Sequence, residues 1–232
     1  MVNYKYLGII ILLLLLCLLC LLCLLYNYKP KYNLYNGSYW NSYRLGDIVN
    51  GYMVRINDPN EKKYLKDIST RWPNSIADKY VKQSGYPESY KMNDLHILRN
   101  ILDGINYDKP DKHTLVIHIR MGDTMEMWKK KLKKDWAIDH THYVKGYDYY
   151  KQILSKIKQI KEIDTIDIVS GSHFNTGLDD SIEYLDNIVD IFKNDYHVNV
   201  KITNNPDKDF YYMCHSEYFC PSGGGYSNLV KS

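Results

Sequence analysis

A histidine and an arginine stand two residues apart where an apolar run ends, in the segment His118-Ile-Arg120-Met-Gly122-Asp123. Side chains two residues apart on an extended strand point to the same side, so His118 and Arg120 would share one face. An arginine stays charged and binds phosphate oxygens through two parallel hydrogen bonds. Gly122 would let a ligand approach the backbone, and Asp123 would orient the arginine or hold the turn. The segment suits a phosphate site, and the competing interpretation is an ordinary turn with a surface arginine.

A second candidate anion site lies near the end of the chain, where three glycines precede a short helical segment. Successive glycines expose backbone N–H groups, and the start of a helix adds positive potential, so such a loop suits a diphosphate. The alternative is a flexible hinge, because a glycine run is only weakly specific. The segment lacks the lysine of a Walker loop and the GxGxxG pattern. Its residues are Ser222, Gly223, Gly224, Gly225, Tyr226 and Ser227.

Two further features would contact the rest of a nucleotide. Ser170-Gly-Ser-His173 follows an apolar run, and Ser170 and His173 would hold a ribose or the edge of a base. The alternative is a polar turn. Asp209 would accept hydrogen bonds from a base, or it would simply cap the helix in which it lies.

Metal-dependent and hydrolytic chemistry is poorly supported. The sequence has no His-x-x-Glu-His pattern, no Cys-x-x-Cys outside its apolar N-terminal segment and no Gly-x-Ser-x-Gly elbow. His140 and His142 fit a solvated loop better than a zinc pair. The lysines between Trp128 and Trp136 fit a solvated flank, with contact to an anionic acceptor or a membrane surface as the alternative. We therefore expect neither a metal nor another cofactor.

Strands alternating with helices would position these residues. This alternation predicts an α/β fold with a parallel sheet covered on both faces. Ligands bind such sheets beyond the carboxyl ends of the strands, and His118–Asp123, Ser170–His173 and Ser222–Ser227 all follow predicted strands. Helices are also expected over 75–83 and 93–105, before the sheet. The predicted strands are 114–119, 165–169, 199–203 and 217–220, and the predicted helices among them are 147–160, 181–192 and 207–213.

Length and charge narrow the classes of protein further. The chain has 232 residues, with 30 Lys+Arg against 27 Asp+Glu and a net charge of +3. That length accommodates one large domain or two small ones. The charge is nearly balanced and no basic face is evident, which argues against a nucleic-acid partner.

The N-terminal region predicts a membrane anchor. Residues 7–25 are all Leu, Ile, Cys or Gly, long enough for a helix of about 28 Å, close to the hydrocarbon thickness of a bilayer. A cleaved signal peptide is the alternative, but no small-residue cleavage site follows. Residues 26–43 are rich in Tyr, Asn and Lys and would form a stem. Lysines flank both sides of the apolar segment, so they hardly discriminate its orientation.

Two cysteines and one glycosylation sequon bear on whether the soluble part of the chain lies in a lumen. Cys214 and Cys220 would form a disulfide in an oxidising lumen, or they would be two buried thiols. Asn36-Gly-Ser is a glycosylation sequon that matters only if the soluble part is lumenal.

The two glycine-containing motifs resemble those of the α-1,2-, α-1,6- and protein-O-fucosyltransferases. The first matches their His-x-Arg-x-Gly-Asp motif, and Ser222–Ser227, preceded by Asp209-Phe210, is similar to their closing motif. Order and separation also match, and the similarity covers residues 113–229. Arg44-Leu-Gly-Asp47 is similar to the glycine turn that opens the N-terminal domain of the family.

The resemblance implies a GT-B fold of two Rossmann-like lobes, with the nucleotide sugar held by the C-terminal lobe. It implies that Arg120 contacts the diphosphate of GDP-fucose, that Ser222, Ser227 and their glycines support the same phosphates, and that transfer is inverting and metal-independent. The acceptor would be a glycan or a protein. With its apolar anchor, the chain would be a single-pass type II protein whose soluble part lies in the Golgi or ER lumen or elsewhere outside the cytoplasm. The lobes would be 44–112, small for an acceptor domain, and 113–232.

This sequence also departs from the family. Many relatives carry a second arginine where it has Met121. Asp47 is the best available candidate for the catalytic base. The alternative function is a catalytically inactive, membrane-tethered protein that retains a degenerate glycosyltransferase fold.

Overall fold

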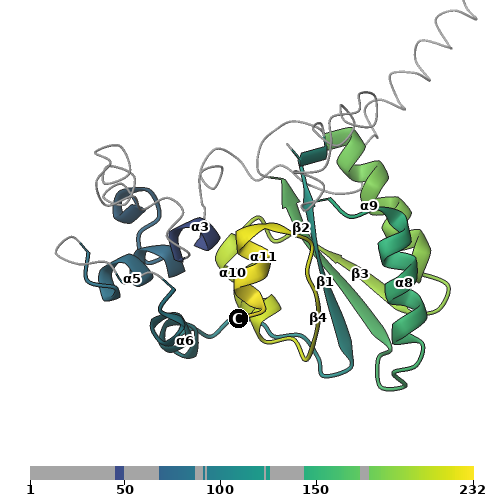
Figure 1. Ribbon diagram of the computed structural model, residues 1–232, viewed down its shortest axis with the longest axis horizontal. Helices are drawn as coiled ribbons and strands as arrows, with labels where there is room; N and C mark the ends of the chain where they lie inside the picture. Colours follow the sequence, from purple (N-terminus) through teal and green to yellow (C-terminus); the bar gives the residue numbers. More distant parts are fainter. Residues whose placement is uncertain are drawn as a thin grey trace, which may run out of the picture. The chain divides into compact units, whose positions relative to one another are not determined.

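A parallel four-stranded sheet forms the centre of the computed structural model, which describes residues 45–49, 68–86, 91, 93–122, 124–125, 144–172 and 178–232. Its strands lie in the order β3-β2-β1-β4 (Figure 1). All three strand pairs are parallel, as predicted. The strands are β1 (Thr114–Met121), β2 (Thr165–Ser172), β3 (His197–Lys201) and β4 (Tyr218–Cys220), and β3 begins two residues earlier than predicted.

The register divides the sheet into two faces. Ile117 of β1 lies opposite Ile168 of β2, and His118 lies opposite Val169. Because side chains alternate along a strand, His118 and Arg120 share one face with Val116, while Ile117 and Ile119 lie on the other. We call these the histidine face and the isoleucine face.

Helices cover both faces (Figure 1). On the isoleucine face lie α8 (Tyr147–Ile157) and α9 (Leu178–Phe192). On the histidine face lie α10 (Pro206–Cys214) and α11 (Gly224–Val230), and Met213 of α10 packs against Val116 and Val169. The side chain of Asn205 caps the start of α10, where Pro206 needs no hydrogen-bond partner for its nitrogen.

Helices also precede the sheet in the described part of the chain. These are α3 (Leu45–Val49), α5 (Ile76–Gln83) and α6 (Leu95–Asp103). Ser75 caps α5, Asp94 caps α6 and Gly104 follows its end, as helix-stop rules predict. The described residues of this region contain no strand, so a second Rossmann-like lobe stays a prediction.

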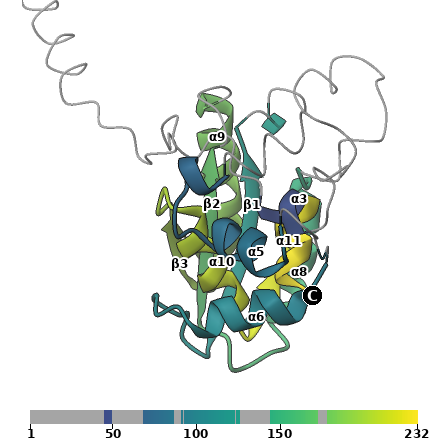
Figure 2. The ribbon, with the colours of Figure 1, turned by 90° about the vertical axis from the view of Figure 1, so that its left-hand side faces the viewer.

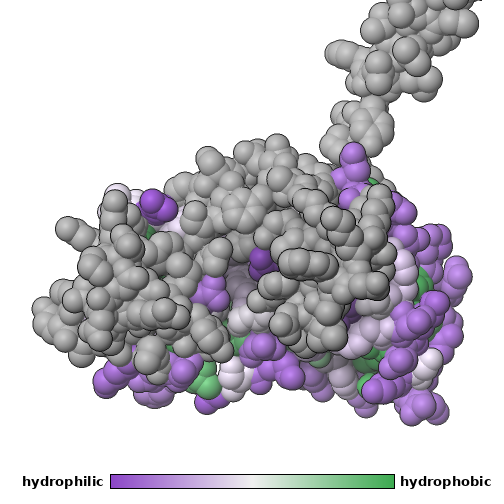
Figure 3. Space-filling model, turned by 45° about the horizontal axis from the view of Figure 1, so that its top comes forward, coloured by the Kyte–Doolittle hydropathy of each residue, from purple (hydrophilic) through white to green (hydrophobic). Residues whose placement is uncertain are grey.

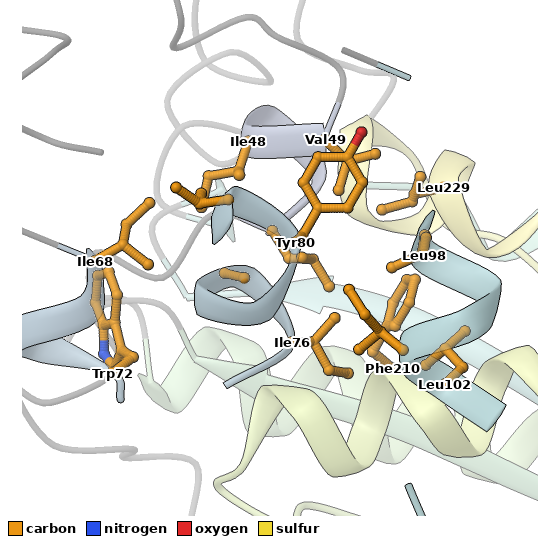
Figure 4. Packing of buried hydrophobic residues seen from close by; sticks show 14 of the residues in the cluster. Ile48, Val49, Ile68, Trp72, Ile76, Tyr80, Leu98, Leu102, Phe210 and Leu229 are labelled. Carbon is orange, nitrogen blue, oxygen red and sulfur yellow. The ribbon is translucent and has the colours of Figure 1, made fainter. Parts of the chain in front are cut away.

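One hydrophobic core joins these helices to the end of the chain. Ile76, Leu98 and Leu102 share it with Phe210 of α10 and Leu229 of α11 (Figures 2 and 4). The Asp207 carboxylate also accepts a hydrogen bond of 3.0 Å from the Ile76 N–H, at the start of α5. The described residues before β1 therefore share a core with α10 and α11. The division into lobes at residue 112 stays a prediction.

Several predictions fall on residues outside the described ranges. These are the apolar segment 7–25, the stem 26–43, Asn36, the pair His140 and His142, and the lysines after Trp128. Among the described helices, none is long and apolar enough to cross a bilayer.

Candidate functional site

The predicted site segments follow strands that end at the same edge of the sheet. β1 ends at Met121, β2 at Ser172 and β4 at Cys220, and both β2 and β4 pair with β1 in parallel. Figure 3 turns this edge toward the viewer, and hydrophilic described residues are visible there between grey atoms. The parallel topology thus brings together segments more than a hundred residues apart in the sequence.

His118 links the first motif to the glycine-rich loop. Its Nδ1 lies 3.0 Å from Oγ of Ser222, and its ring lies 5.6 Å from the ring of Tyr226. Only 9% of His118 is exposed. Burial, together with the charge of Arg120, lowers the pKa of His118 to about 3. The imidazole is therefore neutral near pH 7 and acts as a hydrogen-bonding group rather than a cation.

Arg120 follows on the same face as His118 and is half-buried. Gly122 comes next, with φ of 79°, a left-handed conformation that favours glycine. The Gly122 N–H donates a hydrogen bond of 3.0 Å to Oγ of the fully buried Ser181, on α9. This bond fixes the turn after β1 and so the end of the strand that carries Arg120. Asp123 lies outside the described residues.

The glycine-rich loop is held by its own serines. Oγ of Ser227 is fully buried and accepts a hydrogen bond of 3.1 Å from the Ser222 N–H. Gly224 has φ of 85°, so this position also favours glycine. The contact of the Ser227 hydroxyl with a phosphate stays a prediction, and in this structure the buried hydroxyl oxygen holds the loop.

Tyr226 also supports the site from within. Its ring lies 5.4 Å from that of Phe210, and its hydroxyl donates to the Pro206 carbonyl at the start of α10. Burial raises its pKa well above the usual value, with the nearby carboxylate of Asp209 adding to the effect. Tyr226 is thus a neutral spacer between His118 and α10.

Ser170 does not belong to the site. It is 2% exposed, lies opposite Ile119 in the register and donates a hydrogen bond of 2.8 Å to the Ile119 carbonyl. The prediction that it contacts a nucleotide is therefore wrong, because its side chain lies on the isoleucine face. Gly171, its neighbour, lies opposite Arg120 on the histidine face, and a methyl group added there would meet no atom within 4 Å. His173 lies outside the described residues.

Asp209 lies in the first turn of α10. Its Oδ1 accepts a hydrogen bond of 2.7 Å from Oγ1 of Thr203. Burial raises the pKa of Asp209 to about 7, although the hydrogen bond from Thr203 lowers it. The carboxyl group can therefore be protonated or ionised near neutral pH. Its predicted contact with the base of a nucleotide stays a prediction.

Gly46, the neighbour of the candidate catalytic base Asp47, packs against the glycine-rich loop. A methyl group added at Gly46 would lie 2.4 Å from the backbone of both Gly225 and Tyr226, so the two backbones are in direct contact. Asp47 follows on the same short helix, α3, and is half-buried. Its role as a base stays a prediction.

The two cysteines form no disulfide. Cys214 ends α10 beside the N-terminal helices, whereas Cys220 lies in β4 with its sulfur 3.4 Å from the Tyr149 hydroxyl. Burial raises the pKa of Cys214 to about 12 and that of Cys220 to about 11. Of the two predicted alternatives, a disulfide or two thiols, the structure has two free thiols. Among the described residues, no group of three or more His, Cys, Asp or Glu side chains could hold a metal.

A polar cluster on the histidine face escaped the sequence analysis. Asp167 is 3% exposed, accepts hydrogen bonds from Asn199 and Tyr212, and lies 3.5 Å from the Lys201 ammonium. Lys201 lies in the same row across the sheet as His118, because both are opposite Val169. A polar residue within the apolar run of β2 was the available signal.

Comparison with known proteins gives no family. The chain matches no protein-family model and no curated protein. Two similar solved structures are POFUT1 in complex with GDP, at 13% identity and a TM-score of 0.36, and POFUT1 in complex with GDP-fucose, at 12% and 0.35. Each covers 81% of this chain, which spans 58% and 57% of the POFUT1 chains. TM-scores this low do not establish a common fold.

Proposed function

We propose that this protein is a glycosyltransferase that transfers fucose from GDP-fucose to a glycan or protein acceptor. The motif resemblance supplies the donor. The observation that carries the proposal is the 3.0 Å contact between Nδ1 of His118 and Oγ of Ser222. This contact joins the two segments that resemble the donor-binding motifs of fucosyltransferases, although 104 residues separate them in the sequence.

The chemistry asked of the site is stabilisation of a leaving diphosphate. In inverting transfer, an acceptor hydroxyl attacks the anomeric carbon as the bond to the diphosphate breaks, and a base takes the hydroxyl proton. Arg120 would stabilise the charge that develops on the diphosphate. His118 is suited to organising the loop rather than to supplying charge, because its low pKa keeps it neutral.

Asp47 would be the base. The close packing of Gly46 on Gly225 supports this assignment, because it places α3 directly beside the loop proposed to hold the diphosphate. The acceptor would then approach from the side of α3. Asp47→Asn should abolish transfer while leaving the Kd for GDP within about twofold of the wild-type value, since the base does not contact the nucleotide.

We also propose that residues 7–25 anchor the protein in a membrane as a type II protein with a lumenal soluble part. The uninterrupted apolar segment supports this arrangement. Glycosylation of Asn36 in cells would support it, and an unmodified, protease-accessible stem on the cytoplasmic side would contradict it.

GDP binding by the full-length chain, purified in detergent, tests the proposal. We expect GDP to raise the melting temperature, and Arg120→Ala to weaken binding by about 10- to 100-fold, the loss of a charged hydrogen-bonding partner. Arg99→Ala, which removes an exposed arginine from α6, is the matched control. Incubation with a panel of nucleotide sugars should then give transfer or hydrolysis with GDP-fucose. No GDP binding and no turnover would contradict the proposal.

A second candidate function is nucleotide-sugar binding without catalysis. Met121 favours it, because this residue stands where many fucosyltransferases have a second arginine, and it is fully buried on the isoleucine face. GDP binding without turnover, on any acceptor tried, would support this candidate. A membrane-anchored protein that binds no nucleotide would show no GDP-induced change in melting temperature, either in the wild type or in Arg120→Ala.

A further inference from the structure

The glycine-rich loop is held from the isoleucine face as well as from the histidine face. Tyr149, on α8, donates a hydrogen bond of 3.1 Å from its hydroxyl to the Pro221 carbonyl. The same hydroxyl lies 3.4 Å from the sulfur of Cys220, the last residue of β4. Pro221 directly precedes Ser222, so Tyr149 binds the backbone at the point where β4 ends and the glycine-rich loop begins.

The geometry gives this hydroxyl a defined role. A tyrosine hydroxyl has one hydrogen, so donation to Pro221 leaves its oxygen to accept from the Cys220 thiol. Burial raises the pKa of Tyr149, and the hydroxyl stays a donor at any working pH. The Tyr150 ring lies edge-on at 5.3 Å, and the Lys145 ammonium lies 5.6 Å from the centre of the Tyr149 ring. These neighbours restrict the ring as well as the hydroxyl.

Contacts from three other elements therefore hold the chain at Ser222. His118 binds its side chain from the histidine face, Ser227 accepts from its N–H, and Tyr149 holds the preceding carbonyl from α8. Binding groups must be held to within about 0.5 Å to act, and residues that do not touch the ligand often provide this support. Of these three contacts, the one from Tyr149 alone comes from the far side of the sheet.

We propose that Tyr149 is a positioning residue for the glycine-rich loop: it holds Pro221 in place so that Ser222 and the following amides are ready for a diphosphate. The anchoring of the loop stands on the contacts above, and the consequence for GDP rests on the proposed function.

Tyr149→Phe tests the proposal, because it removes the hydroxyl and keeps the ring. Tyr147→Phe is the matched control: it removes a hydroxyl from the same helix, one that accepts a hydrogen bond of 3.2 Å from Asn187 and does not contact the loop. Hydrogen–deuterium exchange of the ligand-free, full-length proteins gives the first measurement. We expect the amides of Ser222–Tyr226 to exchange several-fold faster in Tyr149→Phe, and at the wild-type rate in Tyr147→Phe. Unchanged loop exchange in Tyr149→Phe would overturn the anchoring.

GDP binding gives the second measurement. Loss of one neutral hydrogen bond predicts a rise in Kd of about three- to tenfold for Tyr149→Phe, and none for Tyr147→Phe. In donor hydrolysis, KM for the nucleotide sugar should rise while kcat at saturating donor stays constant. If the loop exchanges faster but neither wild type nor variant binds GDP, the proposed function fails and the anchoring stands. If the loop exchanges faster and GDP affinity is unchanged, the role in donor binding is wrong.

Discussion

The two faces of β1 use the same strand for different purposes. On the isoleucine face, the side chains of Leu115, Ile117 and Ile119 are apolar and all less than 5% exposed. On the histidine face, the side chains become more polar toward the carboxyl end, from Val116 to His118 to Arg120. A strand can therefore carry a site without weakening its core, because alternation separates the two requirements. The predictions below test that separation, from the largest expected effect to the smallest.

Truncation on the isoleucine face should damage stability alone. Ile117 is fully buried at the centre of the sheet. Ile117→Ala is expected to lower the free energy of unfolding by about 2–5 kcal/mol, and Ile117→Val by about 0.5–1.5 kcal/mol. Urea denaturation measures both. A loss below about 1 kcal/mol for the alanine variant would mean that this face is loosely packed.

Substitution by alanine should have very different effects on stability at two glycines, Gly46 and Gly171. Gly46→Ala would drive a methyl group into the backbone of Gly225, and we expect a loss of about 1–3 kcal/mol because backbone cannot move aside cheaply. Gly171→Ala meets open space, and it should leave stability within about 0.5 kcal/mol of the wild-type value. Thermal unfolding of the pair decides the point, and equal effects would contradict the close contact between α3 and the loop.

Two groups on the histidine face should give opposite pH dependences. The pKa of His118 falls from 6.5 to about 3 on folding, so its contribution to stability is present above pH 6.5 and is lost as pH falls toward 3. The pKa of Asp209 rises from 3.8 to about 7, so its contribution is present below pH 3.8 and is lost as pH rises through 7. Between these limits the two oppose each other.

Denaturation at a series of pH values separates these contributions. His118→Asn should make the unfolding free energy depend less positively on pH between about 4 and 6, and Asp209→Asn should make it depend more positively. Parallel profiles for wild type and both variants would show that neither group changes its pKa on folding.

An exposed ion pair on α8 should matter least. Lys151 lies 3.2 Å from Asp148, and their side chains are 64% and 89% exposed. Lys151→Ala should change the free energy of unfolding by less than about 0.5 kcal/mol, because water screens such pairs. A larger loss of unfolding free energy, measured by urea denaturation, would show that the exposed side of α8 also contributes to stability.

Local patterns in the sequence predicted the elements and the edge where the segments meet. The β-branched run before His118 predicted β1, and the helix expected over 93–105 matches α6 within two residues at each end. The parallel order followed from the alternation of strands and helices.

Contacts distant in the sequence could not be read in the same way. The hydroxyls of Ser170 and Ser227 look available in the sequence, but Ile119 and Ser222 use them. The shared core of α5, α6, α10 and α11 depends on residues such as Ile76 and Phe210 that no local pattern connects. Tyr149 gave no signal at all, since its partner lies 72 residues away.

The position of bound GDP tests the central claim most directly. A crystal structure of the full-length chain with GDP should show the diphosphate between the Arg120 guanidinium and the backbone of Gly223–Gly225, with the contact between His118 and Ser222 retained. GDP bound elsewhere, or a diphosphate that touches neither Arg120 nor the glycine-rich loop, would contradict the account.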